Sequence, residues 1–246
     1  MLKKAFLSIL ALPGLLWLSG CSVGINLDDC VTGDGSTITE ARNLNAFFAV
    51  SSFGDFDIIL RHSTNNDYRV ELSGEKNILD EIVTLVERNT LLVRFAEANC
   101  FQFSEDITIT IFYPPGELEA VNLGGSGSMR GDSLTGDFIN LYLTGSGEID
   151  FPVVANRMKT TISGSGSIDL KGNVNAGNFR IDGSGEINGL SMICKEANVD
   201  IFGSGNAYLF VENQLNAEVG GSGSVFYLGN PTVDSNVSGS GKVTRY

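Results

Sequence analysis

The tripeptide Gly-Ser-Gly recurs through the C-terminal half of the chain at a nearly constant interval, and no other feature of the sequence limits the fold as strongly. The intervals between successive copies are 20, 19, 19, 20, 18 and 18 residues, and the copies begin at Gly125, Gly145, Gly164, Gly183, Gly203, Gly221 and Gly239. A composition rich in glycine and serine is by itself typical of a flexible linker. The regular spacing argues against a linker and indicates a folded repeat.

Two columns of apolar residues accompany the tripeptide. The first column, two positions before each copy, is Leu123, Leu143, Ile162, Ile181, Ile201, Val219 and Val237. The second column, four positions after the first glycine, is Met129, Ile149, Ile168, Ile187, Ala207, Val225 and Val243. Apolar and polar residues alternate around both columns, as in strands that bury one face. The repeat is therefore predicted to be a strand, a Gly-Ser-Gly bend and a second strand.

A β repeat of about nineteen residues is too short for helical repeats or propeller blades and fits one coil of a parallel β-helix. Each strand would pair with its counterpart in the next coil, about 4.8 Å away. The glycines would serve a bend with positive φ, or a corner where a β-carbon would collide with the neighbouring coil. The serines would stack and offer their hydroxyls to adjacent coils. We therefore expect an all-β fold, with a solenoid over residues 121–246.

The polar positions after each bend also form columns. Like charges directly opposite one another on adjacent strands are destabilising, and the first column avoids them, because it reads Ser128, Glu148, Ser167, Glu186, Asn206, Ser224 and Lys242. The column beside it breaks this rule at Asp150, Asp169 and Asn188. Their oxygens are candidate ligands for calcium, although a solvated polar ladder is the favoured interpretation. The nonapeptide calcium repeat is excluded, because its Gly-Gly-x-Gly-x-Asp pattern is absent.

Strand patterns continue upstream of the repeats, over residues 41–120, although the tripeptide is missing there. The predicted strands are 57–60, 68–72, 90–95 and 107–112, with one helical turn at 77–82. Pro114, Pro115 and Gly116 separate this part from the repeats. It forms either irregular first coils of the same solenoid or a small β subdomain of its own.

Residues 1–20 have the pattern of a signal peptide, with a basic start at Lys3 and Lys4 and an apolar stretch too short to span a bilayer. Leu18-Ser19-Gly20-Cys21 resembles a lipobox, which predicts lipidation of Cys21 and an anchor in the membrane. The alternative is an ordinary secretory peptide. Ser22 favours the outer membrane, without fixing whether the protein faces the periplasm or the cell surface. Residues 21–40 would form the lipidated terminus and a tether.

Charge and cysteines limit the partners and the compartment. The chain carries a formal net charge of −13, which becomes −15 without Lys3 and Lys4, so nucleic acid is not an expected partner. Export places the cysteines in an oxidising compartment. Cys30 and Cys100 would pair and leave Cys194 free; alternatively, Cys100 and Cys194 are buried apolar residues.

Several of these features together resemble the family of bacterial auto-transporter adhesin heads known as the GIN domain. The resemblance rests on Phe47 and Phe48, on the runs 57–60, 91–95 and 107–114, and on the Gly-Ser-Gly series, and it covers residues 42–243. It implies a right-handed β-helix, which is also the usual hand of parallel β crossovers. It further implies an exported and often lipid-anchored protein, but no catalytic or binding residues.

No catalytic arrangement is found in the sequence. His62 is the only histidine and is expected to be a surface residue. The repeated serines lack the helix and the nearby base of a nucleophile elbow. Five basic residues among the repeats stand at unrelated offsets from the bends, which is unlike the ordered faces of polysaccharide lyases; they are Arg130, Lys159, Lys171, Arg180 and Lys195. We therefore expect neither an enzyme nor a cofactor.

The function predicted from the sequence is that of a noncatalytic, lipid-anchored module of the cell envelope. As an adhesin, it would bind glycans or envelope proteins through a long ladder face. The alternatives are a structural envelope protein without a specific ligand and, less favoured, a polysaccharide-active enzyme. The strand edge of the last coil, near Tyr246, would also permit self-association into a homo-oligomer.

Overall fold

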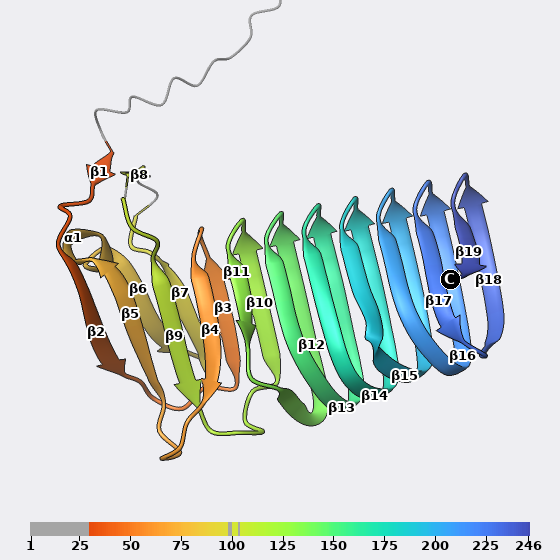
Figure 1. The fold of residues 1–246 in the computed structure, drawn as a ribbon, viewed down its shortest axis with the longest axis horizontal. Helices are drawn as coiled ribbons and strands as arrows, with labels where there is room; N and C mark the ends of the chain where they lie inside the picture. The colour runs from red at the N-terminus through yellow and green to blue at the C-terminus, as the bar shows by residue number, and fades with distance from the viewer. Residues whose placement is uncertain (1–29, 98–99, 103) are drawn as a thin grey trace, which may run out of the picture.

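The computed structural model of the chain describes residues 30–97, 100–102 and 104–246, and its dominant feature is a β-solenoid (Figure 1). A 17-stranded sheet winds through the whole solenoid, and a separate two-stranded sheet joins β1 to β8. The coils are flattened and stack along one long axis. The all-β solenoid with coils of about nineteen residues is thereby confirmed.

The N-terminal part contains short strands and one helical turn. Its elements are β1 (Val31–Thr32), β2 (Thr37–Asn43), β3 (Ala49–Phe53), β4 (Asp57–His62), β5 (Arg69–Glu75), α1 (Lys76–Leu79), β6 (Ile82–Glu87), β7 (Thr90–Phe95), β8 (Phe101–Gln102) and β9 (Thr108–Tyr113). Four of these strands overlap the predicted runs, and α1 lies where one helical turn is expected from the sequence. The helix is only four residues long and buries Ile78 and Leu79.

The repeats form longer strands, because one strand continues around the rounded end of each coil. They are β10 (Ala120–Gly125), β11 (Ser128–Gly131), β12 (Leu134–Gly145), β13 (Glu148–Gly164), β14 (Ser167–Gly183), β15 (Glu186–Gly203), β16 (Asn206–Gly221), β17 (Ser224–Gly229), β18 (Thr232–Gly239) and β19 (Lys242–Arg245). All pairings among these ten strands are parallel, and each Gly-Ser-Gly bend stands above the next.

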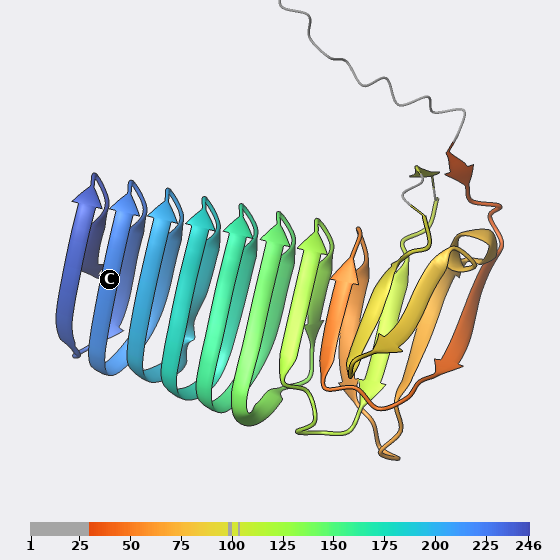
Figure 2. The same ribbon diagram turned by 180° about the vertical axis from the view of Figure 1, so that it is seen from behind.

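Each coil has two broad sides (Figures 1 and 2). The chain leaves a bend, runs along one side, turns at the rounded end and returns along the other side to the next bend. We call the outer surface of the segments that follow the bends the post-bend face, and the opposite surface the pre-bend face. Side chains alternate between the interior and one of these faces, as the burial pattern of β13 shows.

The two glycines of the bend are required for different reasons. Gly164, the first, has φ of 137°, and a β-carbon there would lie 2.2 Å from the carbonyl oxygen of Gly145 in the preceding coil. Gly166, the second, needs no positive φ, but its β-carbon would lie 2.4 Å from the oxygen of Gly147. Ser165 is exposed, and its backbone N–H donates to the oxygen of Gly145 at 2.8 Å. The contact between bends is therefore made by backbone groups.

The core lies between the two sides and consists of stacked aliphatic columns. Ile162, Ile181 and Ile201 of the first predicted column are fully buried, as are Ile149, Ile168 and Ile187 of the second. Stacking identical shapes at the strand spacing removes apolar surface from water, which is the main stabilising contribution in such a fold. Burial ends at the last coil, where Val237 is 38% exposed.

The N-terminal part adds two further coils to the same stack. Strands β3 and β4 pair in parallel with β10 and β11, and on their other side they pair in parallel with β7 and β9. The coil β3–β4 therefore lies between the coil β7–β9 and the first Gly-Ser-Gly coil. Strands β2, β5 and β6 add antiparallel pairings beyond it. They form a cap that ends the solenoid on the N-terminal side.

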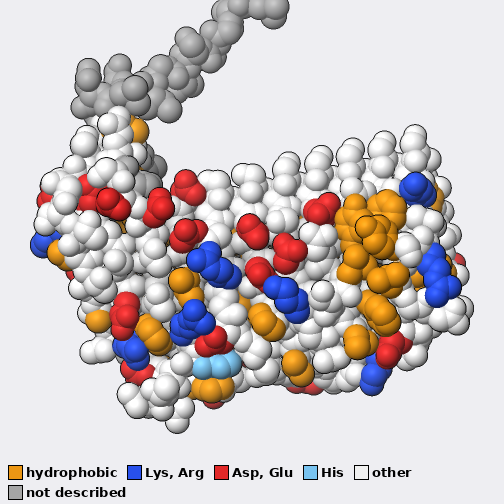
Figure 3. Space-filling model, viewed as in Figure 1, with side chains coloured by type: hydrophobic (Ala, Val, Ile, Leu, Met, Phe, Trp, Pro, Cys, Tyr) orange, Lys and Arg blue, Asp and Glu red, His pale blue; other side chains and the backbone are white. Residues whose placement is uncertain are grey.

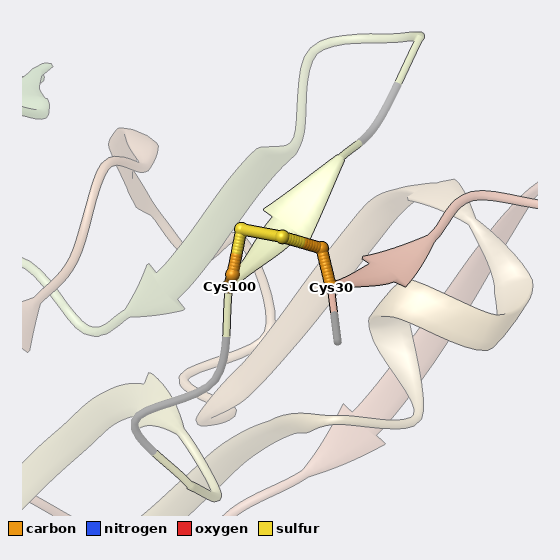
Figure 4. Close-up of a disulfide and its surroundings, with 2 residues drawn as sticks. All are labelled: Cys30 and Cys100. Carbon is orange, nitrogen blue, oxygen red and sulfur yellow. A yellow bond between two sulfur atoms is a disulfide. The ribbon is translucent and has the colours of Figure 1, made fainter. Parts of the chain in front are cut away.

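A disulfide joins Cys30 to Cys100 at the capped end (Figure 4). It clips β1 to β8, where Val31 lies opposite Phe101. This is the first of the two cysteine arrangements considered from the sequence. Among the cysteines in the described ranges, Cys194 is free and buried, and burial raises the pKa of its thiol to about 11. A thiol of that kind is inert at neutral pH.

Candidate functional site

The post-bend face carries different exposed side chains on successive coils (Figure 3). The register confirms the predicted first column, since Ser128 lies opposite Glu148 and the series continues to Lys242. Acidic and basic side chains occupy the earlier coils of this face, and hydrophobic side chains gather over the last ones. The two ends of the face therefore differ in chemistry.

The candidate calcium ligands stand side by side, as the sequence indicates. Asp150 lies opposite Asp169, which lies opposite Asn188. The Lys171 ammonium donates to both carboxylate oxygens of Asp150, at 3.1 and 3.2 Å, and the amide of Asn188 donates to Glu186. Within the described residues, no group of three or more His, Cys, Asp or Glu side chains forms a metal-binding cluster. Calcium binding here stays a prediction without structural support.

Two of the basic residues that stand at unrelated offsets in the sequence come together in space. Arg130 and Lys171 line a hollow of about 230 Å³ with Arg61, which comes from β4 in the N-terminal part. The hollow also includes Ile59 and Pro152. Arg61 pairs with Asp132 at 3.0 Å, and Lys171 pairs with Asp150. Most of the basic charge is thus balanced locally, and the hollow is a shallow surface feature.

His62 is half-buried and has a structural role. Its Nε2 lies 3.1 Å from the carbonyl oxygen of Ser133, and its ring packs edge-on against Tyr113. Its backbone N–H donates to the carboxylate of Asp132. Burial disfavours the charged form of Asp132, but this hydrogen bond and the Arg61 guanidinium outweigh it and lower the pKa. These contacts hold the loop that precedes β12 against the end of β4. None of them forms a nucleophile–base pair.

The remaining basic residues lie elsewhere. Lys159 and Arg180 stand on the pre-bend face, over the rings of Tyr142 and Phe202. An asparagine ladder runs beside them, in which Asn198 donates to Asn178 and Asn216 donates to Asn198, at 2.9 and 2.8 Å. Lys195 lines a hollow at the rounded end of the coils. The structure therefore gathers no set of acidic and basic groups suited to cleaving a polymer in the part that it describes.

A group of apolar side chains lies on the post-bend face of the last coils. We define the aromatic patch as Ile193, Tyr208, Phe210, Phe226, Leu228 and Tyr246. The Tyr208 and Phe226 rings stack with centroids 4.9 Å apart, and the Tyr246 ring packs edge-on against both. Ile193 is 41% exposed and Tyr246 67% exposed. The other four side chains are half-buried. An apolar surface that is left partly exposed in this way is a candidate interaction site.

The sequence contains a signal for this patch, which is a local loss of the alternation between apolar and polar residues. In most coils the outward positions are polar, but the runs Ala207–Val211 and Val225–Leu228 are apolar at every position. Only the inward half of each run is needed for the core. The loss of alternation therefore marks an outer surface whose apolar residues the fold itself does not require.

The predicted lipidation site, Cys21, and the predicted signal peptide lie outside the described residues. A membrane-spanning helix is not found in the part of the chain that the structure describes.

Comparison with known proteins identifies relatives of the whole fold. The family model described as "Putative auto-transporter adhesin, head GIN domain" matches residues 46–231. A putative adhesin from Bacteroides fragilis is 21% identical, with a TM-score of 0.81, over 88% of this chain and 100% of that one. A putative lipid binding protein from Parabacteroides distasonis is 21% identical, with a TM-score of 0.74, over 88% and 99%.

A putative adhesin from Parabacteroides merdae is 22% identical, with a TM-score of 0.69, over 89% of this chain and 99% of that one. At these identities the structures establish the shared fold. No curated protein matches the sequence.

Proposed function

The chain belongs to the family of auto-transporter adhesin head GIN domains, and on this premise we propose that it is a noncatalytic, adhesin-like interaction module of the cell envelope. The observation that carries the proposal is the aromatic patch. It is held on rigid β coils and is too flat to enclose a small molecule, so it suits the surface of a larger partner such as an envelope protein. The described residues offer no competing catalytic site.

A lipid on Cys21 would place the patch at the far end of the molecule from the membrane. Cys30 follows Cys21 by nine positions, a reach of about 30 Å when extended. The disulfide at Cys30 holds the chain at the capped end. Six strand pairings lead from β9 to β16, which at the usual strand spacing is roughly 30 Å of solenoid. The tethered end and the binding end are thus opposite.

The outer membrane is the proposed location, on the strength of the lipobox and of Ser22 after the cysteine. Treating intact cells with protease, beside a lysed control, tests whether the solenoid faces the outside. Degradation in intact cells is the expected result. Protection until lysis would overturn the surface-adhesin function and favour the structural envelope role instead.

Adhesion itself is tested by substituting the patch. The double variant Tyr208→Ser and Phe226→Ser removes its two stacked rings without touching the core. The matched control is Phe202→Ser, which removes an aromatic ring that is 39% exposed on the pre-bend face. We expect attachment of cells to fall at least tenfold in the double variant and to stay unchanged in the control. Equal attachment of both variants and the wild type would contradict the proposal.

A further inference from the structure

The aromatic patch is matched to itself in shape and composition. In the register of the sheet, Tyr208 on β16 lies opposite Phe226 on β17, and Phe210 lies opposite Leu228. Each pair places two side chains of similar size at the same position along neighbouring strands. Exchanging β16 with β17 therefore leaves the pattern of the patch almost unchanged. A surface with this property can pair with a copy of itself in an isologous interface.

The charged residues at the two edges of the patch are related by the same exchange of strands, and their charges are opposite in sign. Glu186 and Lys242 belong to one column, separated by Asn206 and Ser224. Glu186 is on β15, at one edge of the patch, and Lys242 is on β19, at the other edge, with its ammonium 5.8 Å from the centroid of Phe226. Neither side chain has an ion-pair partner in the described ranges. One coil at each edge thus presents an unpaired charge, negative at one edge and positive at the other.

We propose that the aromatic patch binds a second copy of this chain, face to face, about a two-fold axis that runs along the strands between β16 and β17. Such an axis reverses the order of the coils but preserves the position along each strand. Glu186 of one copy then faces Lys242 of the other, twice. Tyr208 faces Phe226 of the second copy in the same way. The symmetry places opposite charges together and buries apolar rings against apolar rings.

Other occupants fit this surface less well. Apart from the tyrosine hydroxyls, the patch side chains carry no hydrogen-bonding groups, so a glycan's hydroxyls would lose water without gaining partners. A lipid chain extended along the stack would leave the patch at Tyr208 and lie next on Asn188 and Asp169, which are polar. A second copy avoids both costs, because its own patch has the same extent.

The same axis sets the two solenoids antiparallel, with their caps at opposite ends. Two lipid-tethered copies would then have their anchors far apart, as on two facing membranes. This step rests on the proposed adhesin function. The binding partner of the adhesin would then be a second copy of the same protein on another cell.

Charge exchange tests the pairing directly. The exported chain from residue 21, carrying Cys21→Ala so that it stays free of lipid, is examined by analytical ultracentrifugation. We expect the wild type to dimerise, and E186K and K242E each to dimerise at least tenfold more weakly, since two like-charge contacts replace two ion pairs. An equimolar mixture of E186K and K242E should recover the wild-type dimer, because every facing pair is again opposite in charge. A mixture that is no tighter than either variant alone would overturn the proposal.

The controls separate this inference from the function on which it builds. Circular dichroism verifies that each variant is folded, and E218K on the pre-bend face should leave dimerisation unchanged. A wild type that stays monomeric at all concentrations refutes the second-copy proposal, even if patch variants still abolish attachment to host or other cells. A dimer restored by charge exchange supports the pairing, even if cells lacking the protein attach normally and the adhesin function fails.

Discussion

The coil formed by β3 and β4 lacks the Gly-Ser-Gly bend that marks the coils after it, and comparing the two kinds of coil explains the tripeptide. Gly54 takes the place of the first glycine and also has a positive φ, of 149°. Phe56 takes the place of the second glycine. It is buried, and its ring packs 4.8 Å from that of Phe95.

The neighbouring coil accounts for this exchange. A β-carbon at Gly127 would meet the backbone of Phe56 at 2.4 Å, because one bend lies directly against the other. On the other side of Phe56, β7 ends at Phe95 and β9 begins at Thr108, so a longer connection stands where the repeats have a Gly-Ser-Gly bend. The second glycine is therefore needed only where a closed bend precedes it. Where the preceding coil is open, a large aromatic side chain fills the space.

The strongest way to break the repeat is to add a single carbon at the second glycine. In Gly166→Ala the new β-carbon would lie 2.4 Å from the oxygen of Gly147 and 2.6 Å from Leu143 Cδ2. We expect a loss above about 4 kcal/mol in the free energy of unfolding, measured by chemical denaturation. The control is Gly136→Ala, whose β-carbon meets only ordinary contact at 3.5 Å. Similar stabilities for the two variants would show that the bends can separate easily.

Removing the large side chain of Phe56 tests the coil β3–β4. Phe56→Ala should destabilise the protein by about 3 to 4 kcal/mol, because it empties a packed aromatic site. Removing the exposed ring in Phe138→Ala is the control and should cost far less. Thermal unfolding measures both. A small effect at Phe56 would mean that the cap collapses onto the first closed bend.

Removing the disulfide should affect the N-terminal cap and the repeats differently. Cys30→Ala opens a link between residues 70 apart in the sequence, and we expect a loss of about 2 to 4 kcal/mol. Hydrogen exchange should increase in β1 and β8, whose pairing is only two residues long, and should be unchanged in the repeats. Cys194→Ala, which leaves the disulfide intact, is the comparison. Faster exchange throughout the solenoid would contradict an effect limited to the cap.

The smallest expected effect concerns pH and is also confined to the cap. Burial of the Glu75 carboxyl raises its pKa, but hydrogen bonds from the backbone of Gly35 and from Ser104 outweigh burial, and the pKa is lowered overall. A lowered folded-state pKa adds stability above the unfolded value of about 4.3, and this stability is lost as the pH falls through the folded value. Glu75→Gln should flatten that acid limb of the stability curve. An unchanged limb would exclude Glu75 as its source.

Much of the solenoid could be predicted from the sequence, because each coil pairs with the coil that is next to it in the sequence. A coil and its neighbour have the same pattern, so the columns of Ile149 and Ile162 follow from counting residues. The order of the N-terminal strands could not be obtained in this way. The coil β3–β4 lies between segments that follow it in sequence, and no repeat relates Ile58 to its two neighbours, Ile109 and Met129.

The same distinction applies to the candidate site, where some residues could be placed from the repeat and others could not. The columns of Glu148, Asp150 and Asp169 followed from the repeat. The hollow with Arg61 did not, because this residue comes from β4 and lies near Arg130 only through the parallel pairing of β4 with β11. The aromatic patch could have been found from the loss of alternation at Ala207–Val211, but that signal has a meaning only once the outer face is known.

The interleaved position of β3 and β4 also sets the order of events as the chain is synthesised and folds. These two strands emerge early, yet both of their neighbours in the sheet are synthesised later, one as β7 and β9 and the other as β10 and β11. The first complete stack therefore requires about eighty residues, from Ala49 to Gly131, and its long-range contacts make it the slow step. Every later coil then adds to an existing template, so folding can proceed one coil at a time from that point to the C-terminal coils.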